Sequence, residues 1–282
     1  MFGRRSDGVP VEGLGIIEKA SPHFMVARND ACNSITHPVR CENMDAWIAE
    51  KRKEGKNYSY MDVVLASIVR LLAIRPWLNR FVVRGKIFQR KGIFISMTVK
   101  KSLKDSAAET VIKVGFDGTE TIDQVKEKFR AEIEKAWGEE TATESAGKKF
   151  TRLPQFLFRW AMGLVRYLDN RGMLPKSLIK ASPFHTSVFL TNLKSIKTDA
   201  IIHHLYNFGT TSLFVAMGKE KEAPVVENGK LAVGKIMNLG INMDERGCDG
   251  FYFARCLKVW NDIFQDPTIL ERPFTEEDII NK

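Results

Sequence analysis

A change in the spacing of apolar residues marks the most informative stretch of the chain, near its carboxyl end. Between Leu231 and Met243 apolar side chains occupy alternate positions, which is the period of a half-buried β-strand. From Phe253 the spacing becomes helical, and this pattern ends at Asp266-Pro267, where proline cannot continue a helix. The polar stretch 244–250, Asp-Glu-Arg-Gly-Cys-Asp-Gly, lies between the two patterns. We therefore predict a strand, a tight polar turn and a helix, an arrangement that often carries functional side chains.

The same two periods predict helices and strands along the rest of the chain. We expect helices at 44–54, 58–74, 121–137 and 153–168, with Pro175 breaking the last one. We expect strands at 23–29, 80–90, 92–100, 110–116, 186–192 and 210–218.

The connections between these elements are also predicted. Strands 80–90 and 92–100 are expected to form a hairpin, and Asn228-Gly229 is a typical turn for a second one. Residues 1–20 are expected to be an irregular N-terminal arm, and 139–152 a mobile linker within the domain, because this segment has almost no apolar content.

The helix expected at 153–168 is apolar at most positions, and Arg152, Arg159 and Arg166 recur seven residues apart on one face. Such a helix can lie on a membrane surface. It can also cover a core or a subunit interface, and this second interpretation is the more frequent one.

Composition indicates an ordinary globular protein. The 282 residues are 44% hydrophobic and 27% charged, enough for one large domain or two small ones. No segment has about 18 uninterrupted apolar residues, and the start lacks the apolar run of a signal peptide, so we expect a cytoplasmic protein without a membrane span.

The net charge of +9 raises the question of a nucleic-acid partner. Acidic residues are interleaved with the basic ones in most segments, so we expect no nucleic-acid partner beyond weak, non-specific binding. An anionic small molecule, such as a phosphate-bearing cofactor, fits the diffuse positive charge equally well, as does a solvated surface without a ligand. The four cysteines, Cys32, Cys41, Cys248 and Cys256, show no CxxC spacing, so we expect free thiols and no metal site.

Three short strings carry a resemblance to a known family. Residues 75–79 are Arg-Pro-Trp-Leu-Asn, residues 188–193 are Val-Phe-Leu-Thr-Asn-Leu, and the third string is the polar stretch 244–250. Together with the order of the elements between them, they make residues 20 to 275 resemble the catalytic domain of the acyltransferase subunits of 2-oxo acid dehydrogenase complexes. The chain also resembles chloramphenicol acetyltransferase, more distantly.

The resemblance implies a fold and an assembly. We expect a single α/β domain over residues 1–282 with the coenzyme A-dependent acyltransferase fold, a mixed β-sheet flanked by helices. It also implies a homotrimer with its active sites at subunit boundaries. No part of this chain resembles a lipoyl domain. We therefore expect a freestanding protein rather than the swinging-arm core of a dehydrogenase complex.

The resemblance further implies transfer of an acyl group between coenzyme A and a small thiol, hydroxyl or amine acceptor. In the family a histidine takes the proton from the attacking group, and a serine or threonine hydroxyl donates to the oxyanion. Thr191 matches that hydroxyl, although a β-branched residue at a strand end needs no such role. Four residues match the part of the motif that shapes the turn: Asp244, Arg246, Asp249 and Gly250.

The chain departs from the family at Glu245, which stands where the family has its histidine. A glutamate has an ordinary pKa of about 4.3 against about 6.5 for histidine, so it serves as a base near neutrality only where burial raises its pKa. The adjacent Arg246 could instead hold it ionised. Cys248, within the same turn, is expected to be a buried, inert thiol.

His203 and His204 are the alternative source of a base, since they follow the strand that carries Thr191. One imidazole could reach the same cleft, or both could be ordinary loop residues. Two functions therefore remain open: an acyltransferase, and a catalytically inactive relative that keeps the trimeric fold as a binding or scaffold module. The enzyme interpretation fails if Glu245 is paired with an arginine and both histidines point away from Thr191.

Overall fold

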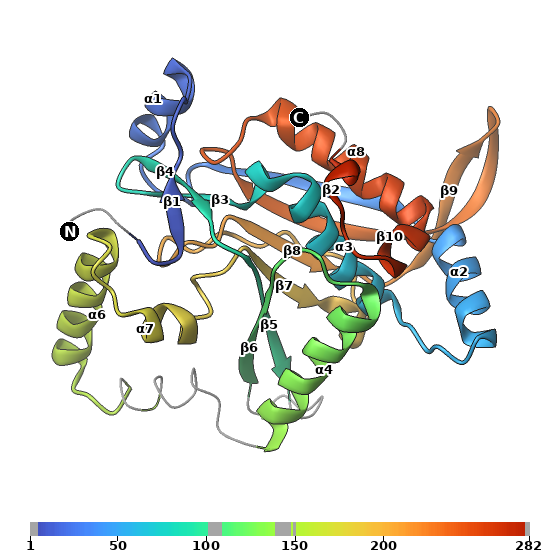
Figure 1. Ribbon diagram of the computed structural model, residues 1–282. Coiled ribbons are helices and arrows are strands. Elements are labelled where there is room, and N and C mark those ends of the chain that lie inside the picture. The colour runs from blue at the N-terminus through green and yellow to red at the C-terminus, as the bar shows by residue number, and fades with distance from the viewer. Residues whose placement is uncertain (1–4, 101–108, 139–147, 149–150, 280–282) are drawn as a thin grey trace.

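The computed structural model describes residues 5–100, 109–138, 148 and 151–279, and a seven-stranded mixed sheet runs through its centre (Figure 1). The strand order is β2-β10-β8-β7-β5-β6, and β9 extends the sheet by pairing with β10. β7 runs parallel to β5 and to β8, and the other pairs are antiparallel. The strands are β2 (Cys32–Arg40), β5 (Ile93–Lys100), β6 (Glu109–Phe116), β7 (Val188–Asn192), β8 (Leu213–Met217), β9 (Lys221–Glu227) and β10 (Lys230–Asp244).

Helices cover one face of this sheet and enclose the main core with it (Figure 1). They are α2 (Glu42–Lys53), α3 (Tyr60–Ile74), α4 (Ile122–Gly138) and α8 (Gly250–Gln265). The period of two predicted for 231–243 is confirmed in β10, whose Met237, Leu239, Ile241 and Met243 are buried against the helices. Between α8 and α3, the indole N–H of Trp260 donates to the Ser67 hydroxyl over 2.8 Å.

The predicted hairpin of 80–90 with 92–100 is wrong. β3 (Arg80–Val83) and β4 (Lys86–Arg90) pair with each other and, with β1 (Gly8–Pro10), form a separate small sheet. The reason is local: Arg84 and Gly85 have φ of 50° and 71°, which is a two-residue turn that closes a hairpin inside 80–90. β5 is therefore free to pair with β6 and β7.

The expectations for the N-terminal region are also wrong. Residues 1–20 are not simply irregular, because they include β1 and most of α1 (Ile16–Phe24). No strand forms at 23–29, and β2 begins only at Cys32. The carbonyls of Met25 and Val26 accept hydrogen bonds from Arg246, over 2.9 and 3.1 Å, so their polar groups are satisfied without a strand partner.

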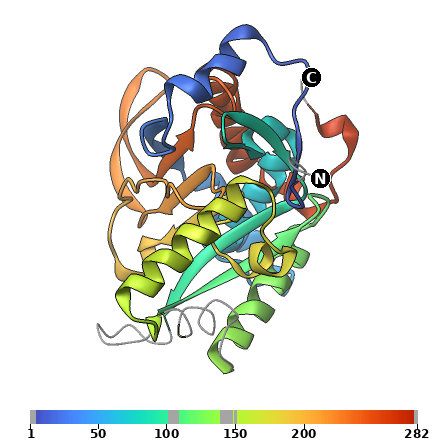
Figure 2. The same cartoon turned by 90° about the vertical axis from the view of Figure 1, so that its left-hand side faces the viewer.

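The helix predicted at 153–168 forms as α6 (Gln155–Asn170), beside the sheet and apart from the core helices α2, α3, α4 and α8 (Figure 2). It ends at Asn170, and Pro175 caps the next helix, α7 (Lys176–Ala181), rather than breaking α6. An apolar stripe on α6 is exposed, with Phe156 71% and Trp160 68% accessible. The linker expected at 139–152 lies mostly outside the described residues.

The hairpin predicted at Asn228-Gly229 is confirmed, with φ of 51° and 77° at its two turn residues. It projects from the body of the molecule (Figure 1). In the described part of the chain, every helix is too short or too polar to cross a bilayer.

Candidate active site

Thr191 lies on the face of the sheet that is turned away from the core helices. On β7, Val188 and Leu190 enter the main core, so Phe189 and Thr191 point to the opposite face. Phe189 stacks there on Phe214 of β8, with ring centroids 5.3 Å apart.

Residues 197–209, which we call the strap, cross this face. Two glycines of the sheet give the strap its space: a Cβ at Gly218 would lie 2.5 Å from the Ala200 nitrogen, and one at Gly240 would lie 3.1 Å from the Ile201 oxygen. The Asp199 carboxylate also accepts from the Asn238 side chain at 3.1 Å. The strap is therefore held close to the strands.

The strap brings His203 to the face that carries Thr191. The imidazole stacks on Phe214, with centroids 4.6 Å apart and planes 7° apart. Phe214 is in register with Phe189, and Thr191 is the next residue along that face, so Phe214 and Thr191 are diagonal neighbours, roughly 7–8 Å apart. His204 is exposed and contacts the ring of Tyr206 instead.

The partner of His203 determines which of its nitrogens can accept a proton. Nδ1 lies 2.7 Å from the Ile201 carbonyl oxygen. A carbonyl only accepts, so Nδ1 carries the hydrogen, and in the neutral ring Nε2 has the free lone pair. This tautomer suits a general base.

The turn after β10 is held together by ion pairs. Arg246 binds both carboxylate oxygens of Asp244 at 2.8 Å, and the Nε of Arg28 lies 3.4 Å from the same group. Burial lowers the pKa of Arg28, and the nearby Arg246 acts in the same direction. Asp249 caps α8 by accepting from the Tyr252 N–H over 2.7 Å, and Gly250 opens that helix.

Glu245 is left out of these ion pairs. Its carboxylate accepts from the Asn33 side chain over 2.5 Å and pairs with no arginine of the described residues. The register places Thr191 opposite Ala216, and Ala216 opposite Gly240. Gly240 is five residues from Glu245, so at about 3.3 Å per residue Thr191 and Glu245 lie roughly 16 Å apart along the strands of one chain.

Cys248 is buried, and burial raises the pKa of its thiol. A thiol with a raised pKa yields little thiolate near neutrality, so a nucleophilic role is disfavoured. Across the described ranges, no three histidine, cysteine, aspartate or glutamate side chains converge as metal ligands.

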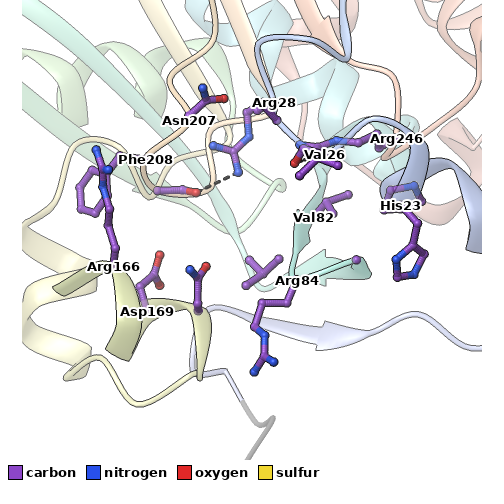
Figure 3. Close-up of a pocket in the computed structure, with 16 residues that line it drawn as sticks. His23, Val26, Arg28, Val82, Arg84, Arg166, Asp169, Asn207, Phe208 and Arg246 are labelled. Atoms are coloured by element: carbon purple, nitrogen blue, oxygen red, sulfur yellow. Dashed lines mark hydrogen bonds between the residues drawn. The ribbon is translucent and has the colours of Figure 1, made fainter. Parts of the chain in front are cut away.

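A cavity of about 510 Å³ opens beside this turn, and we call it the arginine cavity (Figure 3). Its wall includes Arg28, Arg84, Arg166 and Arg246, which come from four separate segments of the chain. Sequence reasoning did not single out Arg28 or Arg84, and the only signal was the net charge of +9.

The one acidic residue of that wall, Asp169, is already occupied. It accepts from Arg5 over 2.8 Å, and its other oxygen lies 3.2 Å from the Nε2 of His185. Arg5 also binds Asp7 and the backbone oxygen of Asp169. This buried cluster joins the N-terminal residues to the last turn of α6.

Comparison with known proteins places these features in context. Residues 197–271, which include the strap and the turn, match the model of the 2-oxoacid dehydrogenases acyltransferase catalytic domain. No curated protein sequence matches the chain. Thr191 lies just outside the matched residues.

Solved structures match along almost the whole chain. A probable dihydrolipoamide acetyltransferase from Listeria monocytogenes 4b F2365 is 15% identical, with a TM-score of 0.57 over 93% of this chain and 95% of the other. The cubic core of the pyruvate dehydrogenase multienzyme complex is 12% identical, with a TM-score of 0.57 over 92% and 93%. Chloramphenicol acetyltransferase is 12% identical, with a TM-score of 0.53 over 91% and 99%.

The predicted fold is thus confirmed as the coenzyme A-dependent acyltransferase fold, a mixed sheet flanked by helices in a single domain. The resemblance is confirmed with it: the chain is similar to the 2-oxoacid dehydrogenase acyltransferase catalytic domain in residues 197–271, and to solved acyltransferases in its overall fold.

Proposed function

We propose that this protein moves an acyl group from coenzyme A to a small thiol, hydroxyl or amine acceptor, with Thr191 and His203 as its central catalytic pair. The observation that carries the proposal is the setting of His203, which lies on the sheet face of Thr191 with Nδ1–H bound to a carbonyl. This leaves Nε2 as the proton acceptor.

The chemistry follows from these two groups. His203 takes the proton of the acceptor as it attacks the thioester carbonyl, and the Thr191 hydroxyl donates to the oxyanion of the tetrahedral intermediate. Collapse of the intermediate breaks the carbon–sulfur bond and releases coenzyme A. The imidazolium returns its proton to the leaving thiolate, so the base is regenerated.

Glu245 is the alternative base. Pairing with an arginine would argue against Glu245 as a base, and its carboxylate pairs with no arginine of the described residues. The roughly 16 Å along the strands means that it would act on the Thr191 of another copy. Such an arrangement fits a homotrimer with sites at subunit boundaries, which we propose for this chain.

The second candidate is an inactive relative that keeps the fold as a binding or scaffold module. The observation in its favour is that the ion pairs of Asp244 support the turn without any contribution from position 245. A protein that had lost its base could therefore keep this turn.

The test is acyl transfer from acetyl-coenzyme A to a panel of small thiols, alcohols and amines. We expect His203→Ala to lower kcat roughly 100- to 10,000-fold, and Thr191→Val roughly 100- to 1,000-fold. His204→Ala, the neighbouring exposed imidazole, should stay within a few-fold of the unmodified protein. A protein that transfers no acyl group and gains no thermal stability from coenzyme A favours the inactive relative.

Mixing of subunits separates the two bases. If His203 acts within one chain, the Glu245→Ala variant keeps its activity, and mixing its subunits with those of Thr191→Val gives no activity beyond the sum of the two. If Glu245 acts across a boundary, Glu245→Ala and Thr191→Val are each inactive, and co-refolded mixtures recover part of the activity. Light scattering checks the proposed trimer independently.

A further inference from the structure

The arginine cavity carries a positive charge that the described residues do not balance. Four arginines and one aspartate form the charged part of its wall. Asp169 lies on α6 three residues from Arg166, and its two carboxylate oxygens are already taken by Arg5 and by His185. Arg28 and Arg246 share the single carboxylate of Asp244.

Two of the arginines have no carboxylate at all. Arg84 and Arg166 are exposed, and neither forms an ion pair or hydrogen bond with a described residue. They come from the β3–β4 turn and from α6. Figure 3 shows Arg28 above the hollow and Arg166 at its left side, and the side chain of Arg84 runs downward from its lower edge, so the three arginines line different sides of one cavity.

The backbone at Arg84 gives a second, independent observation. Arg84 has a φ of 50°, in the left-handed region that asparagine and glycine adopt more readily than arginine. Its neighbour Gly85 is covered by the imidazole of His23, which would lie 2.5 Å from a Cβ at that position. A long cationic side chain thus stands at a position whose backbone favours asparagine, and such strain is found at functional sites.

We propose that the arginine cavity binds the phosphate or carboxylate group of a small anionic molecule, with Arg84 and Arg166 as the side chains that contact it. Arg28, whose side chain is 4% exposed, contributes positive potential from behind. A planar guanidinium with paired N–H donors matches both kinds of anion. Because the group is received in a cavity, this proposal differs from adsorption of a polyanion on a basic surface.

The identity of the ligand rests on the proposed acyl transfer, whereas anion binding itself does not. The anion has two sources in such a reaction: a phosphate of coenzyme A, or a charged group on the acceptor. Both present the same chemistry to Arg84 and Arg166.

The first experiment measures anion binding without any acyl donor. Inorganic phosphate and succinate are titrated by calorimetry and by thermal shift, against sodium chloride at equal ionic strength. Arg84→Asn is the key variant, because asparagine accepts this backbone conformation and the variant should fold at least as well. Arg166→Gln is the second variant. Arg159→Gln is the matched control, because Arg159 lies about two turns earlier on the same helix and outside the cavity wall.

We expect phosphate or succinate to raise the Tm of the unmodified protein and of Arg159→Gln more than chloride does. Loss of one charged hydrogen-bond donor should weaken the Kd roughly 10- to 100-fold in Arg84→Asn and in Arg166→Gln. The proposal is overturned if the anions act no differently from chloride, or if the two cavity variants bind as tightly as Arg159→Gln.

A competition experiment then identifies the source. It measures whether coenzyme A competes with phosphate for the cavity of the unmodified protein. If it does, and if 3′-dephospho-coenzyme A competes less well or coenzyme A binds the cavity variants more weakly, the cavity holds a phosphate of the acyl donor. If coenzyme A binds without displacing it, the anion belongs to the acceptor. Anion binding in a protein that transfers no acyl group would keep this inference and remove the proposed function.

Discussion

Removing the carboxylate of Asp244 is expected to destabilise the whole fold, because two buried guanidinium groups depend on it. The side chain of Asp244 is 1% exposed, and those of Arg246 and Arg28 are each 4% exposed. In Asp244→Ala both cations stay buried, and Arg246 keeps only its bonds to the Met25 and Val26 carbonyls.

The expected cost follows from this burial. Breaking a buried ion pair by deleting one partner costs about 3–5 kcal/mol, because the remaining charge is left uncompensated. That is a large part of the roughly 5–15 kcal/mol by which a folded protein is stable. For a chain of this size it corresponds to a fall in Tm of roughly 10 °C.

The assay is urea unfolding at pH 7, followed by circular dichroism, with two comparisons. Asp262→Ala removes an exposed carboxylate on α8 that has no ion pair among the described residues, and should change the free energy of unfolding by about 0.5 kcal/mol or less. In the double variant Asp244→Ala with Arg246→Met one orphaned cation is also removed, so it should be less unstable than the sum of the two single changes.

The reasoning is refuted if the free energies of unfolding of Asp244→Ala and Asp262→Ala differ by less than about 1 kcal/mol, because breaking a buried ion pair should cost more than that. Strict additivity in the double variant would also contradict it, because residues in one ion-pair cluster should be coupled.

Two further changes test other parts of the fold. Burial lowers the pKa of the Lys113 ammonium to about 7, whereas the unfolded chain keeps that proton up to about pH 10.4. Between these values the unfolded state binds more protons, so stability should rise with pH by up to about 1.4 kcal/mol per unit, and urea titrations of Lys113→Met should show a flatter profile. Gly209→Ala should cost about 2–4 kcal/mol, because φ is +81° and the new Cβ would lie 2.3 Å from the Phe184 oxygen. Gly55→Ala, at φ +84° with open space around it, is the control and should lose clearly less in the same thermal unfolding experiment.

The strand, turn and helix around 244–250 could be predicted because each has its own local signal. Alternation along β10, aspartate at the start of α8 and proline after it are visible in the sequence. β2 gave no such signal, because only one side of this edge strand is partly buried and it contains Pro38. At 23–29 a short apolar run suggested a strand, but Phe24 and Val26 are exposed.

The candidate site was harder to predict, because its distances depend on strand register and on contacts between remote residues. His203 and Thr191 could be named as a pair, but the stacking on Phe214 follows from the path of the strap. Arg28 and Asp244 are far apart in the chain, and nothing local in either segment indicates that they meet.

The cluster that ties Arg5 to Asp169 also has a consequence for the order of folding during synthesis. The two residues are separated by 164 positions. At about 5–20 residues per second, Arg5 leaves the ribosome roughly 10–30 s before its partner exists. Contacts of such high sequence separation form slowly even in the complete chain. The N-terminal residues must therefore wait for the last turn of α6 before they reach their final position on a nascent chain, and the rest of the arginine cavity waits longer, because Arg246 is made later still.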